Sequence, residues 1–397
     1  MDRAQAALKL EVLVLNEIAP LGLQQLPAER YAVVKASPAP DVILVRSREL
    51  HGYDFGARLK AVGRAGAGVN NIPVAQLSAR GVPVFNAPGA NANAVKELVL
   101  AGMLMAARNL APALDFVRTL EPSASDLGRK VEDGKKRFAG IELPGHTLGI
   151  VGLGKIGSLV ADAAIRLGMN VLGYDPEITV DAAWSLPSQV RRAASIDEVL
   201  KSSHFITLHV PLLKQTRHLV NSGNVGQLRS DAILLNFSRE SVVEDGAVLQ
   251  GLRAGKLRCY VTDFPSAALL GQSGVVALPH LGASTGEAEE NSAVMVVNEV
   301  RDYLEHGNLR NAVNFPEASM ARESPFRLAI ANANVPDMLA RISHVLGSRK
   351  LNIHNMLNKS KADMAYTLVD VDSAVGRETL DELRQIDGVL GVRYLPL

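Results

Sequence analysis

Three glycines carry the clearest chemical signal in this chain: Gly152, Gly154 and Gly157. They follow a short apolar run, 148–151, and lead into a helical pattern over 156–167. In this G-x-G-x-x-G spacing, the glycines permit a tight turn, let backbone approach a pyrophosphate and allow a helix to pack closely on a strand. The helix N-terminus then offers unpaired N–H groups and the positive end of its dipole to phosphates. The spacing therefore predicts a dinucleotide-binding turn.

Asp175 ends the next apolar run, 170–174. A carboxylate at the end of this second strand can accept hydrogen bonds from the adenosine ribose, and it repels a 2′-phosphate. We therefore expect NAD rather than NADP as the cofactor, and no metal.

Two further residues turn a cofactor domain into a candidate enzyme. Arg239 follows a predicted strand near 233–236, and His280 follows one near 275–277. A guanidinium can grip a carboxylate and polarise an adjacent carbonyl, and an imidazole exchanges protons near neutral pH. Each residue alone also fits a structural role, Arg239 as a surface cation and His280 as a loop residue. Together at one sheet edge they suit hydride transfer from a 2-hydroxy acid.

These residues need a scaffold, and the pattern along the chain predicts one of several domains. The 397 residues exceed one ordinary core, so two or three domains are expected. Alternating strands and helices predict two α/β domains with doubly wound parallel sheets, Rossmann-like or flavodoxin-like. Residues 1–93 and 284–315 would form a substrate-binding domain, and 94–283 a dinucleotide-binding domain. Two long helical patterns, 92–120 and 285–306, are expected to cross between them.

The last part of the chain is expected to form a separate unit. Residues 307–325 have few apolar residues in series, and 316–325 is interpreted as a linker. Residues 326–397 follow the order β-α-β-β-α-β of a ferredoxin-like fold. Such a fold leaves one sheet face open and often pairs edge to edge, which suggests a dimer contact.

Composition argues against several other classes of protein. Lys and Arg number 42 against 41 for Asp and Glu, so the net charge is near zero. The chain has no polybasic run of the kind that binds nucleic acid or an anionic membrane. No signal peptide is expected, and the longest apolar stretch, 98–107, is about half a membrane span. The single cysteine, Cys259, excludes an intrachain disulfide and is expected to be buried. A cytoplasmic protein is expected.

In combination, these segments resemble the D-isomer-specific 2-hydroxyacid dehydrogenases, and the resemblance spans nearly the whole chain. The tail resembles an ACT domain, a small-molecule regulatory unit. The segments that carry the resemblance are 45–48, 63–70, 152–157, 209–211 with Thr216, 236–239 and 279–285.

The resemblance implies a role for each matching position. His280 would take the hydroxyl proton, and Arg239 would bind the carboxylate and carbonyl oxygen. Asp263 would accept a hydrogen bond from the nicotinamide carboxamide. The other implied cofactor contacts are Gly152, Gly154, Lys155, Ile156, Gly157, Asp175, Pro211, Phe237, Ser238, Gly282 and Ala283. The implied substrate contacts are Arg46, Ser47 and Arg48 for a phosphate, and Gly66, Ala67 and Gly68 for a carboxylate. Effector contacts, often to serine, would fall on Asn332, Asn334 and Asn352.

Two positions depart from the family pattern. A Glu that orients the catalytic His falls on Ala267 here, and no acid lies between Asp263 and Glu287. We expect slower turnover and a shifted pH optimum, because the imidazolium loses a charge partner. In the tail, the Gly that usually follows Pro336 is Asp337, which adds bulk and negative charge beside the expected effector.

The resemblance thus implies NAD-dependent oxidation of a small D-2-hydroxy acid, with 3-phosphoglycerate as the expected substrate and serine synthesis as the setting. A homodimer or homotetramer is expected. Two alternatives stay open: the same chemistry on another small D-2-hydroxy acid, or an NADH-sensing regulatory protein with weak catalysis.

Overall fold

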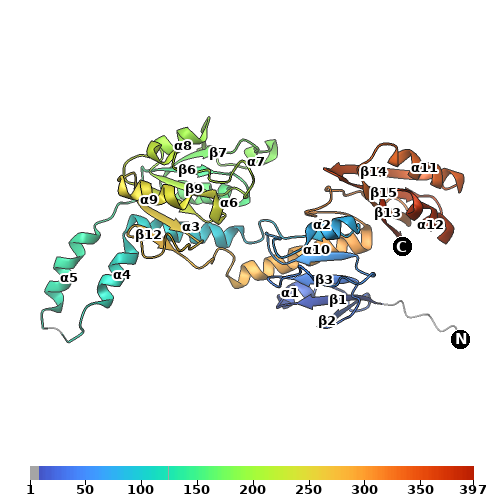
Figure 1. The fold of residues 1–397 in the computed structure, drawn as a ribbon, viewed down its shortest axis with the longest axis horizontal. Helices are drawn as coiled ribbons and strands as arrows, with labels where there is room; N and C mark the ends of the chain where they lie inside the picture. The colour runs from blue at the N-terminus through green and yellow to red at the C-terminus, as the bar shows by residue number, and fades with distance from the viewer. Residues whose placement is uncertain (1–8, 124) are drawn as a thin grey trace. The chain divides into compact units, whose positions relative to one another are not determined.

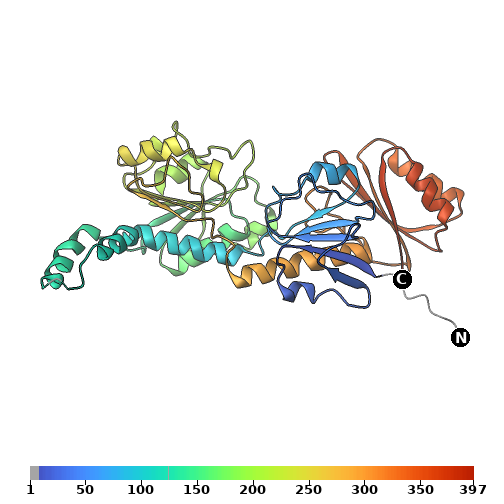
Figure 2. The same cartoon turned by 60° about the horizontal axis from the view of Figure 1, so that its bottom comes forward.

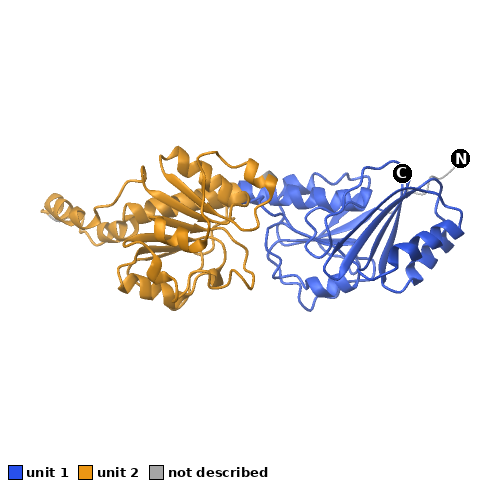
Figure 3. Ribbon diagram, turned by 90° about the horizontal axis from the view of Figure 1, so that it is seen from above, with its two compact units in different colours: residues 1–91, 286–397 blue, residues 92–285 orange. Residues whose placement is uncertain are grey.

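The computed structural model describes residues 9–123 and 125–397. The chain divides into two compact units, one of Met1–Asn91 with Gly286–Leu397 and the other of Ala92–Thr285 (Figure 3). Each unit contains one parallel sheet, and the first also contains an antiparallel sheet (Figure 1). The α/β architecture expected from the sequence is confirmed.

The second unit is built on a seven-stranded parallel sheet in the order β12-β11-β10-β9-β6-β7-β8. Counted from β6, this is the doubly wound order of dinucleotide-binding folds, and the strand order reverses between β6 and β9. Val151 of β6 pairs with Leu208 of β9 at that reversal. The strands are β6 (Thr147–Val151), β7 (Asn170–Tyr174), β8 (Arg191–Arg192), β9 (Phe205–Leu208), β10 (Ala232–Asn236), β11 (Leu257–Thr262) and β12 (Val275–Ala277).

Alternate residues of each strand point to opposite sides of this sheet, and the side chains on both sides are buried. Ile150 and Leu235 belong to a core cluster with α3, whereas Val151 and Leu234 belong to a second cluster on the other face. Cys259 is buried as expected. The helical segments after β6 are α6 (Lys155–Arg166), α7 (Val180–Trp184), α8 (Ile196–Ser202), η2 (Val225–Gln227), η3 (Glu240–Val242) and α9 (Asp245–Arg253).

The long helix expected over 92–120 is broken, so that prediction was wrong. Asn109 adopts a left-handed conformation with φ +51°, which an α-helix cannot continue. The break separates α3 (Ala92–Ala107) from α4 (Leu110–Arg118), and the two axes bend by 67°. In the described part of the chain, no single helix is long and apolar enough to cross a membrane; α3 and α4 together meet that test only as a bent pair.

The polar stretch after α4 contains an unexpected helix, α5 (Leu127–Lys135), followed by η1 (Lys136–Phe138). Ion pairs one turn apart support it, among them Arg129 and Lys130 with Asp126. The hairpin of α4 and α5 extends away from the sheet of its own unit (Figures 1 and 2).

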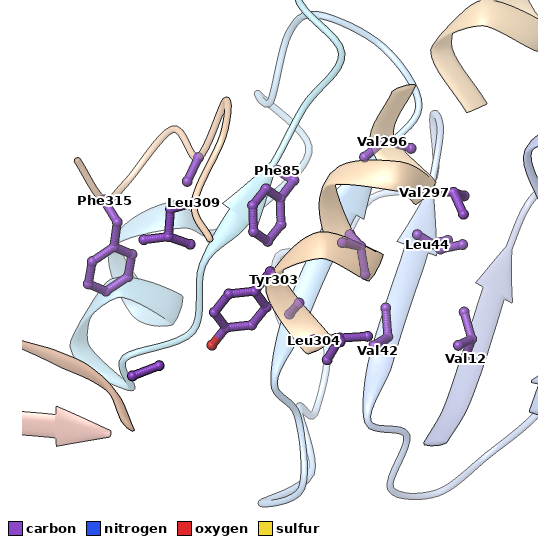
Figure 4. Close-up of a cluster of buried hydrophobic side chains, with 14 of the residues drawn as sticks. Val12, Val42, Leu44, Phe85, Val296, Val297, Tyr303, Leu304, Leu309 and Phe315 are labelled. Atoms are coloured by element: carbon purple, nitrogen blue, oxygen red, sulfur yellow. The ribbon is translucent and has the colours of Figure 1, made fainter. Parts of the chain in front are cut away.

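The first unit contains a five-stranded parallel sheet in the flavodoxin-like order β2-β1-β3-β4-β5. Its helix α10 (Gly286–His306) packs on the sheet through Val296 and Val297, which lie beside Leu44 (Figure 4). The edge strand β2 was not predicted, because it is short and its Val33 is exposed. The remaining elements are β1 (Leu10–Leu15), α1 (Pro20–Leu23), β2 (Tyr31–Val34), β3 (Val42–Val45), β4 (Ala61–Arg64), α2 (Val74–Ala79) and β5 (Val84–Phe85).

The C-terminal residues form the expected β-α-β-β-α-β unit, with an antiparallel sheet in the order β14-β15-β13-β16. Its two helices cover one face of the sheet (Figure 2). They share a core with the sheet through Ile330, Ile342 and Leu383. The elements are β13 (Phe326–Ala333), α11 (Met338–Ser348), β14 (Ile353–Lys361), β15 (Met364–Val371), α12 (Arg377–Gln385) and β16 (Val389–Pro396).

The other face of this sheet is not open, and the tail is not joined by a free linker. Tyr366 and Leu368 are buried in one cluster with Tyr303 of α10. Within the expected linker, Ala318 is 1% exposed and forms a β-bridge with Leu309. The tail therefore packs as part of the first unit, through apolar residues of its second sheet face such as Ala329 and Ala331.

A buried ion pair reinforces this packing. The Arg327 side chain is fully buried and donates to both carboxylate oxygens of Asp370, at 2.6 and 2.8 Å. Its remaining N–H groups donate to the carbonyls of His306, Met320 and Ala321. This arginine therefore ties the tail sheet to the end of α10 and to the connecting segment.

Candidate functional site

The carboxyl-terminal edge of the seven-stranded sheet collects the polar residues singled out in the sequence. The glycine turn follows β6, Asp175 follows β7, Arg239 follows β10, and His280 follows β12. All seven strands run parallel, so their carboxyl ends meet at one edge. Ligands bind at this edge in open α/β sheets, near the point where the strand order reverses.

The glycine turn is shaped for backbone to approach a ligand. Gly152 has φ +91°, and a Cβ there would lie 2.5 Å from the His209 carbonyl oxygen. A Cβ on Gly157 would lie 2.0 Å from the Gly152 oxygen, so helix and strand pack as closely as the motif requires. At Gly154 a Cβ would meet nothing within 4 Å, which leaves open space in front of the α6 N-terminus. This geometry fits a bound pyrophosphate.

Asp175 is held against the same turn. One of its carboxylate oxygens accepts from the Leu153 N–H at 2.8 Å, and the other accepts from the Glu177 N–H at 3.0 Å. Each oxygen keeps a lone pair for a further donor. The carboxylate is therefore fixed where the ribose of a dinucleotide on this turn would lie.

A buried amide supports the turn that carries Arg239. Asn236 is fully buried, and its side-chain NH₂ donates to the Arg239 carbonyl at 2.9 Å. Its Oδ1 accepts from the Ser238 N–H and hydroxyl, at 3.2 and 2.9 Å. Arg239 is exposed, and its guanidinium donates to the Ser238 carbonyl at 2.6 Å. Sequence reasoning missed the role of Asn236, whose only signal is an amide at the end of an apolar strand.

A buried carboxylate supports the loop that carries His280. The Asp263 carboxylate accepts from the Leu281 and Gly282 N–H groups, at 2.7 and 2.8 Å, and its carbonyl accepts from the His280 N–H at 3.0 Å. Burial raises the pKa of the Asp263 carboxyl, and these bonds oppose the rise. The structure thus gives Asp263 a positioning role that the sequence did not indicate.

The His280 ring itself is exposed, and no carboxylate bonds to it among the described residues. Its backbone has φ +59°, a left-handed conformation that is uncommon outside glycine and frequent at functional sites. The ring packs edge-on against Phe264, with centroids 5.0 Å apart. Ala267, where the family pattern has Glu, lies exposed in the turn after β11.

The other expected cofactor residues divide between surface and interior. The Phe237 side chain is buried in the core against α3. The Ser238 hydroxyl and the Gly282 N–H already bond to Asn236 and Asp263. The residues that stay accessible are Lys155, Ile156, Pro211 and Ala283.

His209, at the end of β9, is a neutral structural residue. Burial lowers its pKa to about 3. One ring nitrogen lies 2.9 Å from the Thr207 hydroxyl, and the other has no partner among the described residues.

The expected substrate residues lie at the carboxyl-terminal edge of the five-stranded sheet, in the first unit. Arg46 donates to Glu289 of α10 at 2.6 Å, so its charge is already paired. Ser47 and Arg48 are exposed, and Arg48 lines a cavity of about 960 Å³. The Asn71 side chain donates to the Arg48 carbonyl and accepts from Arg64.

Arg64 was not singled out in the sequence, although it precedes the expected carboxylate loop. Its guanidinium lies over that loop, as shown by the 2.5 Å that would separate a Cβ on Gly66 from an Arg64 nitrogen. Ala87 donates to the Gly66 carbonyl and Asn86 to the Ala67 carbonyl, so the loop from Gly66 to Gly68 is held in place.

In the tail, Asn332 and Asn334 line one cavity of about 190 Å³, together with Asn358 and Asp337. Asn352 does not reach this cavity; its N–H donates to Asp372. Asp337 has φ +66°, the left-handed conformation that glycine adopts most readily. No group of three or more metal-ligating side chains occurs in the described residues.

Comparison with known proteins places these residues in a family. Residues 100–282 match the model of the D-isomer specific 2-hydroxyacid dehydrogenase, NAD binding domain. A D-3-phosphoglycerate dehydrogenase of Haemophilus influenzae is 33% identical over 350 residues, covering 85% of this chain and 82% of that protein. One from Methanocaldococcus jannaschii is 36% identical over 72% of this chain and 55% of that protein, so the chain spans about half the length of that relative. A hydroxypyruvate reductase of Thermotoga maritima is 34% identical over 68% of this chain and 87% of that protein.

Solved structures show the same fold. An NAD⁺-bound 3-phosphoglycerate dehydrogenase of Entamoeba histolytica superposes with a TM-score of 0.60 at 23% identity, covering 77% of this chain and 99% of that chain.

Proposed function

The chain belongs to the D-isomer-specific 2-hydroxyacid dehydrogenase family, and we propose that it oxidises the C2 hydroxyl of 3-phosphoglycerate with NAD. The observation that carries the proposal is the carboxyl-terminal edge of the seven-stranded sheet. There the glycine turn with Asp175, the cation of Arg239 and the imidazole of His280 follow β6, β7, β10 and β12 of one parallel sheet.

The chemistry divides among these residues. Bound NAD supplies the acceptor for the hydride that leaves C2. The Arg239 guanidinium binds the substrate carboxylate and stabilises the carbonyl oxygen that forms. His280 takes the hydroxyl proton, and its loop stays fixed because Asp263 holds three consecutive N–H groups. Asn236 holds the Arg239 turn in the same manner.

The preference for a phosphorylated acid rests on the arginines of the first unit. Arg48 is exposed, and Arg64 is oriented by Asn71 beside the Gly66 loop. Guanidinium groups bind phosphate oxygens in a bidentate manner, so these two cations are the candidates for the 3-phosphate.

Initial rates with NAD and a panel of D-2-hydroxy acids, with and without phosphate, test the proposal. We expect kcat/KM for 3-phosphoglycerate to exceed that for glycerate by about 100-fold, since one desolvated ion pair contributes about 3 kcal/mol. Equal kcat/KM for the two acids would refute the phosphate preference. Absence of turnover with every acid would refute the proposed dehydrogenase activity.

A second candidate function is the same reaction on an unphosphorylated acid. The specific observation in its favour is the ion pair between Arg46 and Glu289, which withdraws one expected phosphate ligand. A relative named for hydroxypyruvate points the same way. The rate panel separates the two candidates.

For the tail we propose an ACT-type regulatory role, with the cavity beside Asn332 and Asn334 as the effector site. The β-α-β-β-α-β order and the loop before α11 support it. Asp337 places a carboxylate in this cavity, which disfavours an amino acid carboxylate. Calorimetric titration with serine, repeated on Asp337→Gly, tests the role; binding to neither protein would refute it.

We further propose a homo-oligomer joined through the hairpin of α4 and α5. Leu114 and Val117 of α4 are 55% and 58% exposed, and Val131 of α5 is 39% exposed. Such apolar exposure on a projecting element favours association. Light scattering of Leu114→Asp and Val117→Asp would show a smaller particle if the hairpin is the contact.

A further inference from the structure

A cavity of about 510 Å³ lies inside the first unit, where the tail packs against the five-stranded sheet. We call it the junction cavity. Leu59, Lys60 and Val82 line one side, just before β4 and β5 begin. The residues Val389–Arg393 of β16 line the other side. The cavity therefore lies at the amino-terminal edge of the parallel sheet, opposite the edge that carries Arg46 and Arg48.

The junction cavity is strongly positive. Five cationic side chains line it, Arg58, Lys60, Arg80, Arg384 and Arg393, and no carboxylate does. A concave site lined by one sign of charge concentrates ligands of the opposite sign.

The carboxylates behind the cavity neutralise only part of this charge. Arg58 and Lys60 share the buried Asp41, and Arg384 pairs with Asp381 on the surface. Burial would raise the pKa of the Asp41 carboxyl, but bonds from Lys60, from a backbone N–H and from Arg58 hold it below its usual value. Asp41 is thus ionised and offsets one of these two charges, while Glu11 acts on Arg58 from farther away.

Arg80 and Arg393 have no carboxylate partner among the described residues, yet both are held in place. Arg80 donates to the Phe55 and Gly56 carbonyls, at 2.7 and 2.8 Å. Arg393 donates to the Tyr303 and Leu304 carbonyls, at 2.9 and 2.8 Å, and lies 4.3 Å over the Tyr303 ring. Carbonyls hold a guanidinium without cancelling its charge, so these two arginines are positioned in advance for an anion.

The shape of the cavity suits a small molecule with a carbon body. Its base is formed by buried apolar and aromatic groups, including Ala329, Ala331 and Tyr366, while Ala57 and Arg58 at its mouth are exposed. The volume is within the range of metabolite sites. From this geometry we propose that the junction cavity binds a small metabolite carrying two or more negative charges, as carboxylate or phosphate groups.

This site is distinct from the proposed catalytic residues. Arg239 and His280 belong to the other unit, and the effector cavity beside Asn332 lies elsewhere in the tail. A ligand here would contact cations from the sheet, Lys60 and Arg80, and from the tail, Arg393. Its binding would therefore strengthen the packing of the tail on the first unit.

Calorimetric titration of the full chain with citrate and, separately, with pyrophosphate tests the proposal. The decisive variant is Ala57→Glu, which puts a negative charge at the mouth of the cavity and removes no hydrogen bond. The matched control is Ala57→Gln, of the same size and without charge. A second control, Arg377→Gln, removes an exposed cation of the tail that does not line the cavity.

We expect at least one of the two anions to bind the wild-type chain, with affinity at least about tenfold weaker in Ala57→Glu and unchanged in both controls. The same anion should raise the melting temperature of the wild-type chain more than that of Ala57→Glu. Citrate alone binding would identify a polycarboxylate site, and pyrophosphate alone a phosphate site. Absence of saturable binding in the millimolar range would overturn the proposal. Equal binding by Ala57→Glu and Ala57→Gln would also overturn it, because an anion that binds only at Arg239 or at the substrate arginines would not respond to the charge at position 57.

Discussion

The two parallel sheets use their carboxyl-terminal edges differently. At the seven-stranded sheet, buried Asn236 and Asp263 bond to the backbone of the loops, and the Arg239 and His280 side chains are left exposed. At the five-stranded sheet, two of the cations are themselves engaged, Arg46 by Glu289 and Arg64 by Asn71, while Arg48 is exposed. A group that must change its protonation state or meet a developing charge needs free atoms on a fixed backbone. A group that only binds can be held through its own side chain.

The largest effect is expected from His280→Asn, which removes the proton acceptor at the seven-stranded sheet. Loss of a general base lowers kcat by about 1,000-fold. Steady-state rates measure the loss, and an unchanged melting temperature shows that the fold persists. The control His51→Asn alters an exposed histidine of the first unit and should keep wild-type rates. A loss below threefold for His280→Asn would mean that another group takes the proton.

Asp263→Asn tests whether the backbone anchor matters as much as the exposed ring. An amide offers one acceptor oxygen where two N–H groups now bond, so one N–H loses its partner. We expect kcat to fall about 100-fold and stability by about 1–3 kcal/mol. Faster hydrogen exchange at Leu281 and Gly282 should accompany the loss. Unchanged exchange with reduced kcat would point instead to direct cofactor contact.

Ala267→Glu tests the missing charge partner of His280. A carboxylate beside the ring stabilises the imidazolium, so kcat should rise about tenfold. The same carboxylate favours the charged ring, so the acid limb of the kcat/KM profile for oxidation should move to higher pH. Ala267→Gln controls for side-chain size. Rates and profile equal to wild type, in a folded variant, would show that Ala267 does not occupy the position of the family's Glu.

His209, which lies beneath the glycine turn, should make the free energy of unfolding depend on pH. Its pKa is about 3 in the fold, below the ordinary value of 6.5. As pH falls through 6.5 the unfolded chain takes up a proton that the fold excludes, so stability present above that pH is lost toward pH 3. Between pH 7 and 5 this loss amounts to about 2 kcal/mol. Urea unfolding of His209→Gln should lack that part of the decline, whereas His51→Gln should retain it.

The smallest effect is expected from Glu289→Gln, which frees Arg46 at the five-stranded sheet. The pair is partly exposed, with side chains 37% and 41% accessible, so releasing it changes little by itself. KM for 3-phosphoglycerate should fall about threefold with kcat unchanged, since one more cation can face the phosphate. KM for glycerate should stay the same. An equal change for both acids would show that Arg46 does not face the phosphate.

Much of the architecture could be predicted from the sequence because local patterns specify it. The strand at 275–277 has the predicted bounds, and the strand expected near 233–236 runs over Ala232–Asn236. The break at Asn109 could not be predicted, since the helical pattern continues through it and a single left-handed residue ends the helix. The positioning roles of Asn236 and Asp263 were equally hidden, because backbone N–H groups brought near by folding leave no mark in sequence spacing.

The sequence by itself determined the dinucleotide turn, the acid that follows it and the alternation of strands and helices. These features depend on glycine geometry, helix and strand periodicity and the ends of strands, all of which are local. Only the tertiary structure decided that the tail packs on the first unit, that Arg327 is buried against Asp370, and that five cations meet in the junction cavity. Those contacts join residues far apart in the chain, and whether an apolar face stays open depends on what folding brings against it.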